Sequence, residues 1–241
     1  LSRRQRQMCI RDRCSLALVL PFLCLTAEGK DFTVVIDPGH GGHDPGAIGR
    51  RGKEKNINLN VALKVGRLIQ NNCKDVKVIF TRRSDVFIPL DRRAQIANNA
   101  KADLFISIHT NSVARGRNVR GTETYTLGLH RTEENLEVAK KENSVIIIED
   151  NYQQRYAGFN PNSSESYIIF EFLQDKNMEK SVKLATLIQK QFKTSARRID
   201  KGVHQAGFLV LRETSMPGVL VELGYICLLY TSPSPRDVEE S

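Results

Sequence analysis

The sequence predicts an α/β fold, a mostly parallel twisted sheet flanked by helices, in one domain that carries an edge insertion. Short β-branched runs alternate with segments of helical periodicity, and the first run ends abruptly at Asp37-Pro38-Gly39. Strands that alternate with helices imply right-handed crossovers and parallel pairing. The chain of 241 residues is long enough for one well-packed domain.

The first half of the chain supplies the alternating elements. Residues 33–36 form a β-branched run, and residues 56–69 place Ile57, Val61 and Val65 at helical spacing. In chain order we expect strand 33–36, helix 56–69, strand 76–81, helix 90–99, strand 104–109 and strand 121–127.

Residues 128–178 interrupt this rhythm and predict an insertion at the edge of the sheet. The stretch is polar and mixed, with a charged, helical portion at 133–150. An amphipathic helix is expected at 179–192, followed by apolar runs at 207–211 and 218–225 that predict the closing strands.

The two ends differ from the rest of the chain. Residues 14–27 contain an apolar run that follows two arginines, closes on small residues and is too short to span a bilayer, so we expect a secretory signal peptide. Residues 1–13 and 227–241 do not continue the patterning of their neighbours and resemble translated sequencing adapter. We therefore expect an artefact at each end, a folded domain over 33–226, and a natural C-terminus lost at about Ile226.

Charge and cysteine content narrow the class of protein only slightly. The formal net charge of +9 suits an anionic polymer, a nucleic acid or a membrane surface. No basic stripe interleaved with aromatics is present, so we expect no nucleic-acid partner. The chain has five cysteines, and only Cys73 lies within the expected domain at 33–226. A single cysteine excludes an intrachain disulfide framework there.

Four residues stand where strands end or helices begin. His40 follows the first strand, Glu54 precedes the first helix, His109 closes the strand at 104–109, and Glu222 interrupts an apolar strand. Ligands of open α/β sheets bind at the carboxyl ends of the strands, so the two histidines should converge there. Two imidazoles and a carboxylate are a common ligand set for catalytic Zn²⁺, one per chain here, and a glutamate beside the metal can serve as base and acid.

Each of these residues also has an ordinary structural interpretation. A histidine at a strand end is more often a surface residue than a ligand, a loop glutamate is usually solvated, and Glu222 could pair with a buried arginine. The joint pattern at one sheet edge favours the metal site.

Several motifs together resemble a known family. Val-Ile-Asp-Pro-Gly-His-Gly-Gly, Ser-Ile-His-Thr-Asn, Gly-Thr-Glu-Thr-Tyr and Val-Glu-Leu-Gly-Tyr are similar to the zinc-dependent N-acetylmuramoyl-L-alanine amidases of the type-3 family, which includes the cell-division amidases. The resemblance covers nearly all of residues 33–226 and implies a single catalytic domain. It implies that His40, Glu54 and His109 bind zinc and that Glu222 is catalytic. It further implies hydrolysis of the peptidoglycan amide between N-acetylmuramic acid and L-alanine.

Other residues are weaker candidates. Asp37 could orient His40 or cap the turn, and Asn111 and Arg212 could hold polar groups of the substrate or be structural. In the cell-division amidases an inserted helix can occlude the zinc until a partner protein displaces it. Here Glu149, in the helix expected within the insertion, could reach the metal in this way. A substrate-binding lid or a simple elaboration of the edge is the alternative.

The resemblance also sets expectations for partners and location. We expect peptidoglycan as substrate, an activator protein acting on 128–178, a monomer, and a secreted protein of the periplasm or cell envelope. Two other functions stay open, a zinc exopeptidase and a non-catalytic wall-binding protein on the same fold. The family's helix after Glu-Leu-Gly-Tyr is replaced here by the unusual tail.

Overall fold

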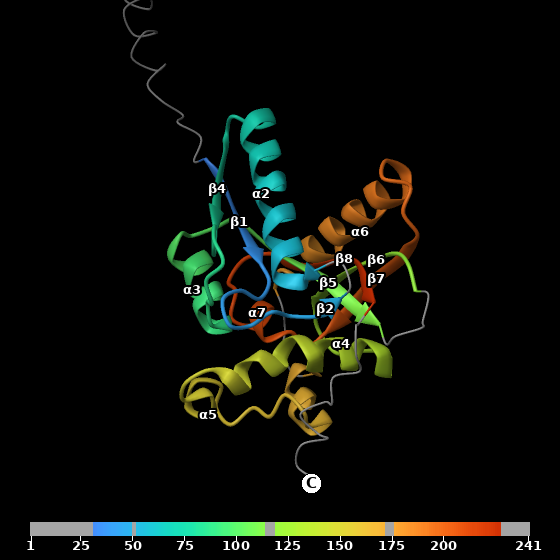
Figure 1. The fold of residues 1–241 in the computed structure, drawn as a ribbon. Coiled ribbons are helices and arrows are strands. Elements are labelled where there is room, and N and C mark those ends of the chain that lie inside the picture. Colours follow the sequence, from blue (N-terminus) through green and yellow to red (C-terminus); the bar gives the residue numbers. More distant parts are fainter. Residues whose placement is uncertain (1–30, 50–51, 114–118, 172–175, 228–241) are drawn as a thin grey trace, which may run out of the picture. The chain divides into compact units, whose positions relative to one another are not determined.

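A six-stranded sheet in the order β4-β1-β5-β8-β6-β7 organises the fold (Figure 1). The computed structural model describes residues 31–49, 52–113, 119–171 and 176–227. The artefact expected at 1–13 and the signal peptide expected at 14–27 lie outside these ranges, as does all of the expected C-terminal artefact except Cys227. The strands are β1 Phe32–Pro38, β4 Val76–Phe80, β5 Leu104–Val113, β6 Thr122–Leu127, β7 Asp200–Ala206 and β8 Gly218–Cys227.

The sheet is mostly parallel, as predicted. Strand β1 pairs in parallel with β4 and β5, β5 with β8, and β6 with β7. The antiparallel pairing lies between β6 and β8, where the chain reverses before the insertion. A separate two-stranded ribbon, β2 Ile48–Gly49 and β3 Gly52–Lys53, leads into the first long helix.

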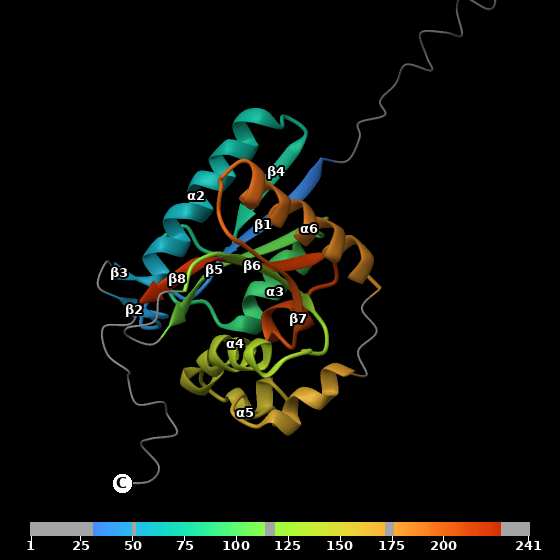
Figure 2. The same ribbon diagram turned by 90° about the vertical axis from the view of Figure 1, so that its right-hand side faces the viewer.

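Helices cover both faces of the sheet (Figures 1 and 2). One face is covered by α2 Glu54–Asn72, whose Ala62 packs on Ile36 and Ile108, and by α6 Met178–Thr194, whose Ala185 packs on Val219 and Val221. The elements that share the hydrophobic core of the opposite face are α3 Leu90–Asn99, α4 Glu133–Asn143, η2 Ser144–Ile148, α5 Tyr152–Arg155, η3 Ser164–Glu171 and α7 Leu209–Arg212.

The insertion therefore extends over one face of the sheet. Its Leu136, Ile146 and Tyr167 belong to the same buried cluster as Val35 and Phe105 of the central strands. Because successive strand residues point to opposite faces, Asp37, His109 and Glu222 share the face on which Val35, Phe105 and Leu220 meet the insertion. The functional residues predicted from the strand ends thus lie on the side that the insertion covers.

Two sequence expectations were wrong in detail. Residues 207–211, expected as a strand, lead into α7, which begins at Leu209, and the strand lies just before them as β7. Strand β7 is at the edge of the sheet and carries the polar sequence Asp-Lys-Gly-Val-His-Gln-Ala, so it lacks the apolar alternation of a covered strand. The apolar Leu209–Leu211 segment is instead buried in the core.

The helix expected over 133–150 also differs from the structure. Helix α4 ends at Asn143 and continues as the 3₁₀ segment η2. Thr132 caps its N-terminus by accepting the Asn135 backbone N–H at 3.3 Å. No helix in the described part of the chain has the length and apolar character needed to cross a membrane.

Candidate active site

Four buried side chains converge on the face beneath the insertion. They are His40, Glu54, His109 and Glu142, and one ligand atom of each lies within 4.8 Å of those of the others. We call these four residues the His–Glu cluster. Three of them were predicted from the sequence, and Glu142 was not.

A strained loop after β1 carries His40. Its φ of 60° is unusual for a residue other than glycine, and backbone strain of this kind is common at functional sites. Gly39 precedes it, and a Cβ there would lie 2.3 Å from the His109 ring. A Cβ on Gly46 would lie 2.6 Å from the His40 ring. The glycines of this loop therefore let the two imidazoles approach each other and the carboxylates.

The orientation of His40 is fixed by Asp44. The Nδ1 atom of His40 lies 2.7 Å from Asp44 Oδ2, which fixes the ring so that Nε2 faces the cluster. The other oxygen of Asp44 accepts the Gly46 backbone N–H at 3.0 Å. A carboxylate that orients a ligating histidine was expected at Asp37, and the structure places Asp44 in direct contact instead.

Glu54 is the first residue of α2 and is completely buried. Its Oε2 accepts the Ala47 N–H at 2.9 Å and its Oε1 accepts the Thr110 N–H at 3.0 Å. Its position at the N-terminus of α2 adds the favourable helix dipole. These contacts hold the carboxylate 3.2 Å from His40 Nε2. Burial raises the pKa of Glu54, but the charges of Lys141 and His40 outweigh it and hold the pKa well below its ordinary value.

His109 stands at the start of a register shift in β5. It is paired with Glu222 of β8, and the pairing shifts before Asn111. Burial lowers the pKa of His109, yet the charge and hydrogen bond of Glu142 raise the pKa to about 9. Burial also lowers the pKa of His40, but Glu54, Asp44 and Glu142 together raise that pKa well above its ordinary value.

Glu142 reaches the cluster from α4 of the insertion. Its Oε2 lies 2.9 Å from His109 Nδ1 and 3.1 Å from His40 Nε2, while its Oε1 lies 2.9 Å from Lys141 Nζ. Asn143, the last residue of α4, anchors this end of the helix by donating to the Gly207 carbonyl at 2.7 Å and accepting the Leu209 N–H at 2.9 Å. Sequence reasoning missed Glu142 because it lies in a charged helix, where one glutamate among several carries no distinguishing pattern.

Glu149, the acidic residue expected to reach the metal from the insertion, lies elsewhere. It accepts the Leu90 N–H at 3.0 Å and the Tyr156 hydroxyl at 2.7 Å. Its side chain joins α3 to α5, and Glu142 is the insertion's carboxylate in the His–Glu cluster.

Glu222 lies beside the cluster on β8 and is 1% exposed. Neither of its carboxylate oxygens has a hydrogen-bond partner. Burial and the charge of Glu142 raise the pKa of Glu222 to about 8, against the opposing charges of His109 and Lys141. A carboxyl group that sits near its pKa at neutral pH can both accept and deliver a proton.

Asp37 and Asn111 are buried but do not belong to the His–Glu cluster. Asp37 is buried beside the cluster, where it accepts hydrogen bonds from Thr81, Arg93 and Ser107 at 2.6, 2.9 and 2.8 Å. Asn111 is buried on β5, and its side-chain oxygen accepts the Ser112 N–H at 2.7 Å.

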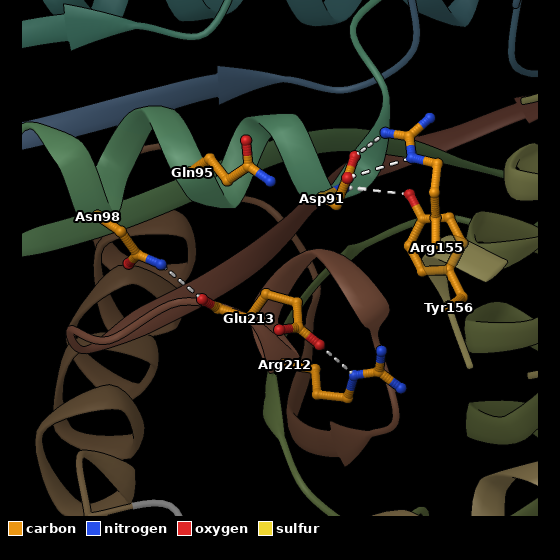
Figure 3. A pocket seen from close by; sticks show the side chains of 7 residues that line it. All are labelled: Asp91, Gln95, Asn98, Arg155, Tyr156, Arg212 and Glu213. Carbon is orange, nitrogen blue, oxygen red and sulfur yellow. Dashed lines mark hydrogen bonds and ion pairs between the residues drawn. The ribbon is translucent and has the colours of Figure 1, made fainter. Parts of the chain in front are cut away.

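Arg212 is not brought to the cluster. It lines a polar cavity of about 210 Å³ together with α3 and α5, and its Nε donates to Glu213 at 2.7 Å (Figure 3). The same cavity is lined by Asp91, Gln95, Asn98, Arg155 and Tyr156. Most of these side chains pair with one another, with Arg155 bound to Asp91 and Asn98 donating to the Glu213 carbonyl at 2.8 Å.

Comparisons with known proteins identify the family that the chain resembles. The family profile described as N-acetylmuramoyl-L-alanine amidase matches residues 34–228. N-acetylmuramoyl-L-alanine amidase AmiA of Escherichia coli is 33% identical over 203 residues, which cover 83% of this chain and 67% of that protein.

Solved structures of similar sequence share the fold. The catalytic domain of the amidase CwlV from Paenibacillus polymyxa superposes with a TM-score of 0.54 at 31% identity, with 80% of each chain covered. An amidase of Clostridium difficile 630 gives a TM-score of 0.60 at 27% identity, covering 88% of this chain and 86% of that one. The resemblance drawn from the sequence motifs is therefore confirmed.

Proposed function

Because the chain belongs to the N-acetylmuramoyl-L-alanine amidase family, we propose that His40, Glu54 and His109 hold a zinc ion and that Glu222 is the catalytic carboxyl group. The family gives the reaction, hydrolysis of the amide between N-acetylmuramic acid and L-alanine in peptidoglycan. The metal-binding roles are supported by the convergence of four buried ligand atoms within 4.8 Å, and the role of Glu222 by its buried, unpaired oxygens beside them.

The His–Glu cluster fits a divalent metal by its chemistry. His40 Nε2, His109 Nδ1 and Glu142 Oε2 are buried without a hydrogen-bond partner, although Glu142 Oε2 lies 2.9–3.1 Å from the two imidazole nitrogens. Lone pairs in such proximity repel unless protons or a cation lie between them. Two imidazole nitrogens and carboxylate oxygens form a donor set typical of catalytic zinc. When bound, zinc would lower the pKa of a water molecule and polarise the amide carbonyl.

Glu222 would move the proton. It would accept a proton from the attacking water and deliver it to the nitrogen of L-alanine as the carbon–nitrogen bond breaks. The products are a glycan that carries the lactyl carboxylate and a peptide with a free amino terminus. The lack of hydrogen-bond partners on both Glu222 oxygens suits this role, because no bond has to break first.

Two buried residues near the cluster would have supporting roles: Asn111 would bind the substrate, and Asp37 would stabilise the loop that carries His40. Asn111 accepts the Ser112 N–H through its oxygen, and its amide nitrogen remains able to donate to a substrate carbonyl. Asp37 would act on His40 only through Arg93, whose guanidinium also donates to the His40 carbonyl at 3.0 Å. Arg212 lies in the separate polar cavity and is not part of this proposal.

The insertion would hold the site closed. Glu142 occupies the position from which the substrate carbonyl or the attacking water has to approach the two histidines. An activator protein would release α4 by binding the insertion. Isoleucines of η2 and η3 stand 37–52% exposed on it and could contact such a partner: Ile147, Ile148, Ile168 and Ile169. Because peptidoglycan lies in the cell envelope, the protein would act there, after export directed by the segment at 14–27.

Product analysis tests the reaction. The purified chain is incubated with zinc and peptidoglycan, and the products are identified by mass spectrometry. We expect free peptides that begin with L-alanine and glycan strands with intact lactyl groups. Release of single amino acids would favour an exopeptidase, and binding without release would favour a wall-binding protein. Glu142→Ala serves as the parallel sample, since it opens the site if basal turnover is too low to detect.

A further inference from the structure

A β-bulge places two functional side chains of β8 on the same face. Glu222 pairs with His109 of β5, and after the register shift Tyr225 pairs with Asn111. Gly224 lies in the bulge with a φ of 150°. Residues three apart normally point to opposite faces of a strand, but the extra residue brings Tyr225 to the side of Glu222.

Glu123 of β6 is the direct neighbour of Glu222 across the antiparallel pair. Side chains in such register lie on one face with their Cβ atoms about 5 Å apart. Glu123 is 5% exposed, and no role for this residue follows from the metal site. Two buried glutamates thus stand side by side next to the two imidazoles.

Glu123 is fully hydrogen-bonded, whereas Glu222 is not. The carboxylate of Glu123 accepts the Tyr125 hydroxyl at 2.7 Å, the Tyr225 hydroxyl, and the Lys201 ammonium at 3.0 Å. Burial raises the pKa of Glu123, but the donors Tyr225, Tyr125 and Lys201 outweigh it and lower the pKa below its ordinary value. Glu222 has no partner on either oxygen.

Both phenols lie close to Glu222 as well. Tyr125 is paired with Leu220, two residues before Glu222 on the same face, which makes it a diagonal neighbour. Burial, the charge and hydrogen bond of Glu123 and, more weakly, the charge of Glu222 raise the pKa of both hydroxyl groups. After Glu123, Glu222 is the next carboxylate whose charge acts on both hydroxyl groups, so it is the acceptor left for them when Glu123 is removed.

We propose that Glu123 is a positioning residue for the amidase reaction, because it binds the hydroxyls of Tyr125 and Tyr225 and so keeps them from donating to Glu222. Glu222 then presents two free oxygens to the proton of the attacking water. A carboxylate that accepted one or two phenol hydrogen bonds would have to break them before it could accept that proton, which would slow the chemical step. This inference rests on the proposed role of Glu222.

A purely structural role for Glu123 makes the opposite prediction for a combined variant. If Glu123 only joins β6, β7 and β8, each further loss of a hydrogen bond lowers activity or stability further. If it restrains the phenols, removing their hydroxyl groups restores the activity that was lost with Glu123. The two roles are therefore separated by a suppressor experiment.

The test compares zinc-loaded Glu123→Met with the triple variant Glu123→Met/Tyr125→Phe/Tyr225→Phe, assayed on peptidoglycan. We expect Glu123→Met to lower kcat by roughly tenfold or more, since general acid–base catalysis is worth about 10²–10⁴-fold, with KM and zinc content unchanged. The triple variant should recover kcat to within about threefold of the parent. Glu149→Gln is the matched control, since it weakens a buried glutamate–tyrosine pair of 2.7 Å outside the His–Glu cluster and should not lower kcat.

Three results would overturn the inference. They are full kcat in Glu123→Met, a triple variant that is no more active than Glu123→Met, and loss of zinc from Glu123→Met. If Glu123→Met does not fold, the triple variant still decides, because it leaves neither phenol unpaired and must be active if the inference holds. Glu222→Gln separates the two levels: unchanged activity in that variant would refute the proposed function of Glu222 itself.

Discussion

Two buried polar clusters lie side by side on the face beneath the insertion, and they differ in how completely they are paired. In the first, which we call the Asp37–Arg93 cluster, the Asp37 carboxylate accepts three hydrogen bonds and Arg93 donates to Asp37, Ile88, Pro38 and His40. Arg82 belongs to it and donates to the carbonyls of Pro38, Ser84, Gly39 and Lys55. In the His–Glu cluster Glu54 is hydrogen-bonded to backbone N–H groups, but His40 Nε2, His109 Nδ1 and Glu142 Oε2 face one another without hydrogen bonds.

This contrast in pairing separates a structural cluster from a functional one. A fully paired buried network stabilises a fold, here by fixing the loop that carries His40. Unpaired buried nitrogens and oxygens cost stability and persist where a ligand or a reaction uses them. Substitutions in the first cluster should therefore affect stability, and those in the second should affect zinc and catalysis.

The largest expected effect is on catalysis at Glu222. Glu222→Gln should lower kcat by about 10³-fold or more, since the amide cannot accept the proton. Stability should stay close to that of the parent, because neither oxygen of Glu222 has a hydrogen-bond partner to lose. Peptide release from peptidoglycan and thermal melting measure both effects. A loss of melting temperature together with activity would assign Glu222 a structural role instead.

The next effect concerns stability at Arg93. Arg93→Met leaves the buried Asp37 carboxylate without its ion pair of 2.9 Å and should lower the free energy of unfolding by about 3–5 kcal/mol. Denaturant titration measures this loss. The double variant Asp37→Asn/Arg93→Met should be less destabilised than Arg93→Met alone, because no unpaired charge remains. Equal stability of the single and double variants would contradict the assignment.

Substitution of Glu142 should raise activity, by a smaller factor than the loss expected at Glu222. Glu142→Gln keeps the shape of α4 but weakens its hold on the histidines, so peptidoglycan cleavage should rise by roughly tenfold, equivalent to about 1.4 kcal/mol. Lys140→Gln is the neighbouring control, since Lys140 pairs with Glu137 and Glu133 on α4 and does not contact the His–Glu cluster. Unchanged or lower activity in Glu142→Gln would argue against autoinhibition by the insertion.

The smallest effect is the dependence of stability on acid. Burial raises the pKa of Asp37, but Arg93, Thr81 and Ser107 outweigh it, so the pKa lies below 3.8 in the folded state. A lowered pKa contributes stability above the unfolded value of 3.8 and loses it as pH falls further, through the folded pKa. Melting temperatures of the parent should converge with those of Asp37→Asn below pH 3.8. A constant difference between the two across that range would contradict this linkage.

The sequence predicted most of the fold and three of the four cluster residues. His40 and His109 stand at the ends of parallel strands, where topology alone brings side chains together. Glu54 was found in a polar segment, although α2 begins at Glu54 itself, two residues before the helix expected at 56–69. These positions could be predicted because the ends of strands are marked locally in the sequence.

The rest depended on tertiary packing. Glu142 was missed and Glu149 was favoured, because only the docking of α4 decides which glutamate of a charged helix points at the histidines. Asp44 was passed over for Asp37, because the left-handed backbone at His40 turns the loop back on itself. Strand β7 was placed at 207–211, since an edge strand lacks the apolar pattern on which such predictions depend.

Zinc stoichiometry shows whether the His–Glu cluster is a metal centre. The chain, His109→Ala and Asp37→Asn are each loaded with zinc, dialysed and measured by mass spectrometry of the metal. We predict one zinc per chain in the parent, one in Asp37→Asn, and a loss of tightly held zinc in His109→Ala. The same zinc content per chain in the parent and in His109→Ala, or no zinc in the parent, would show that the His–Glu cluster is not a zinc site.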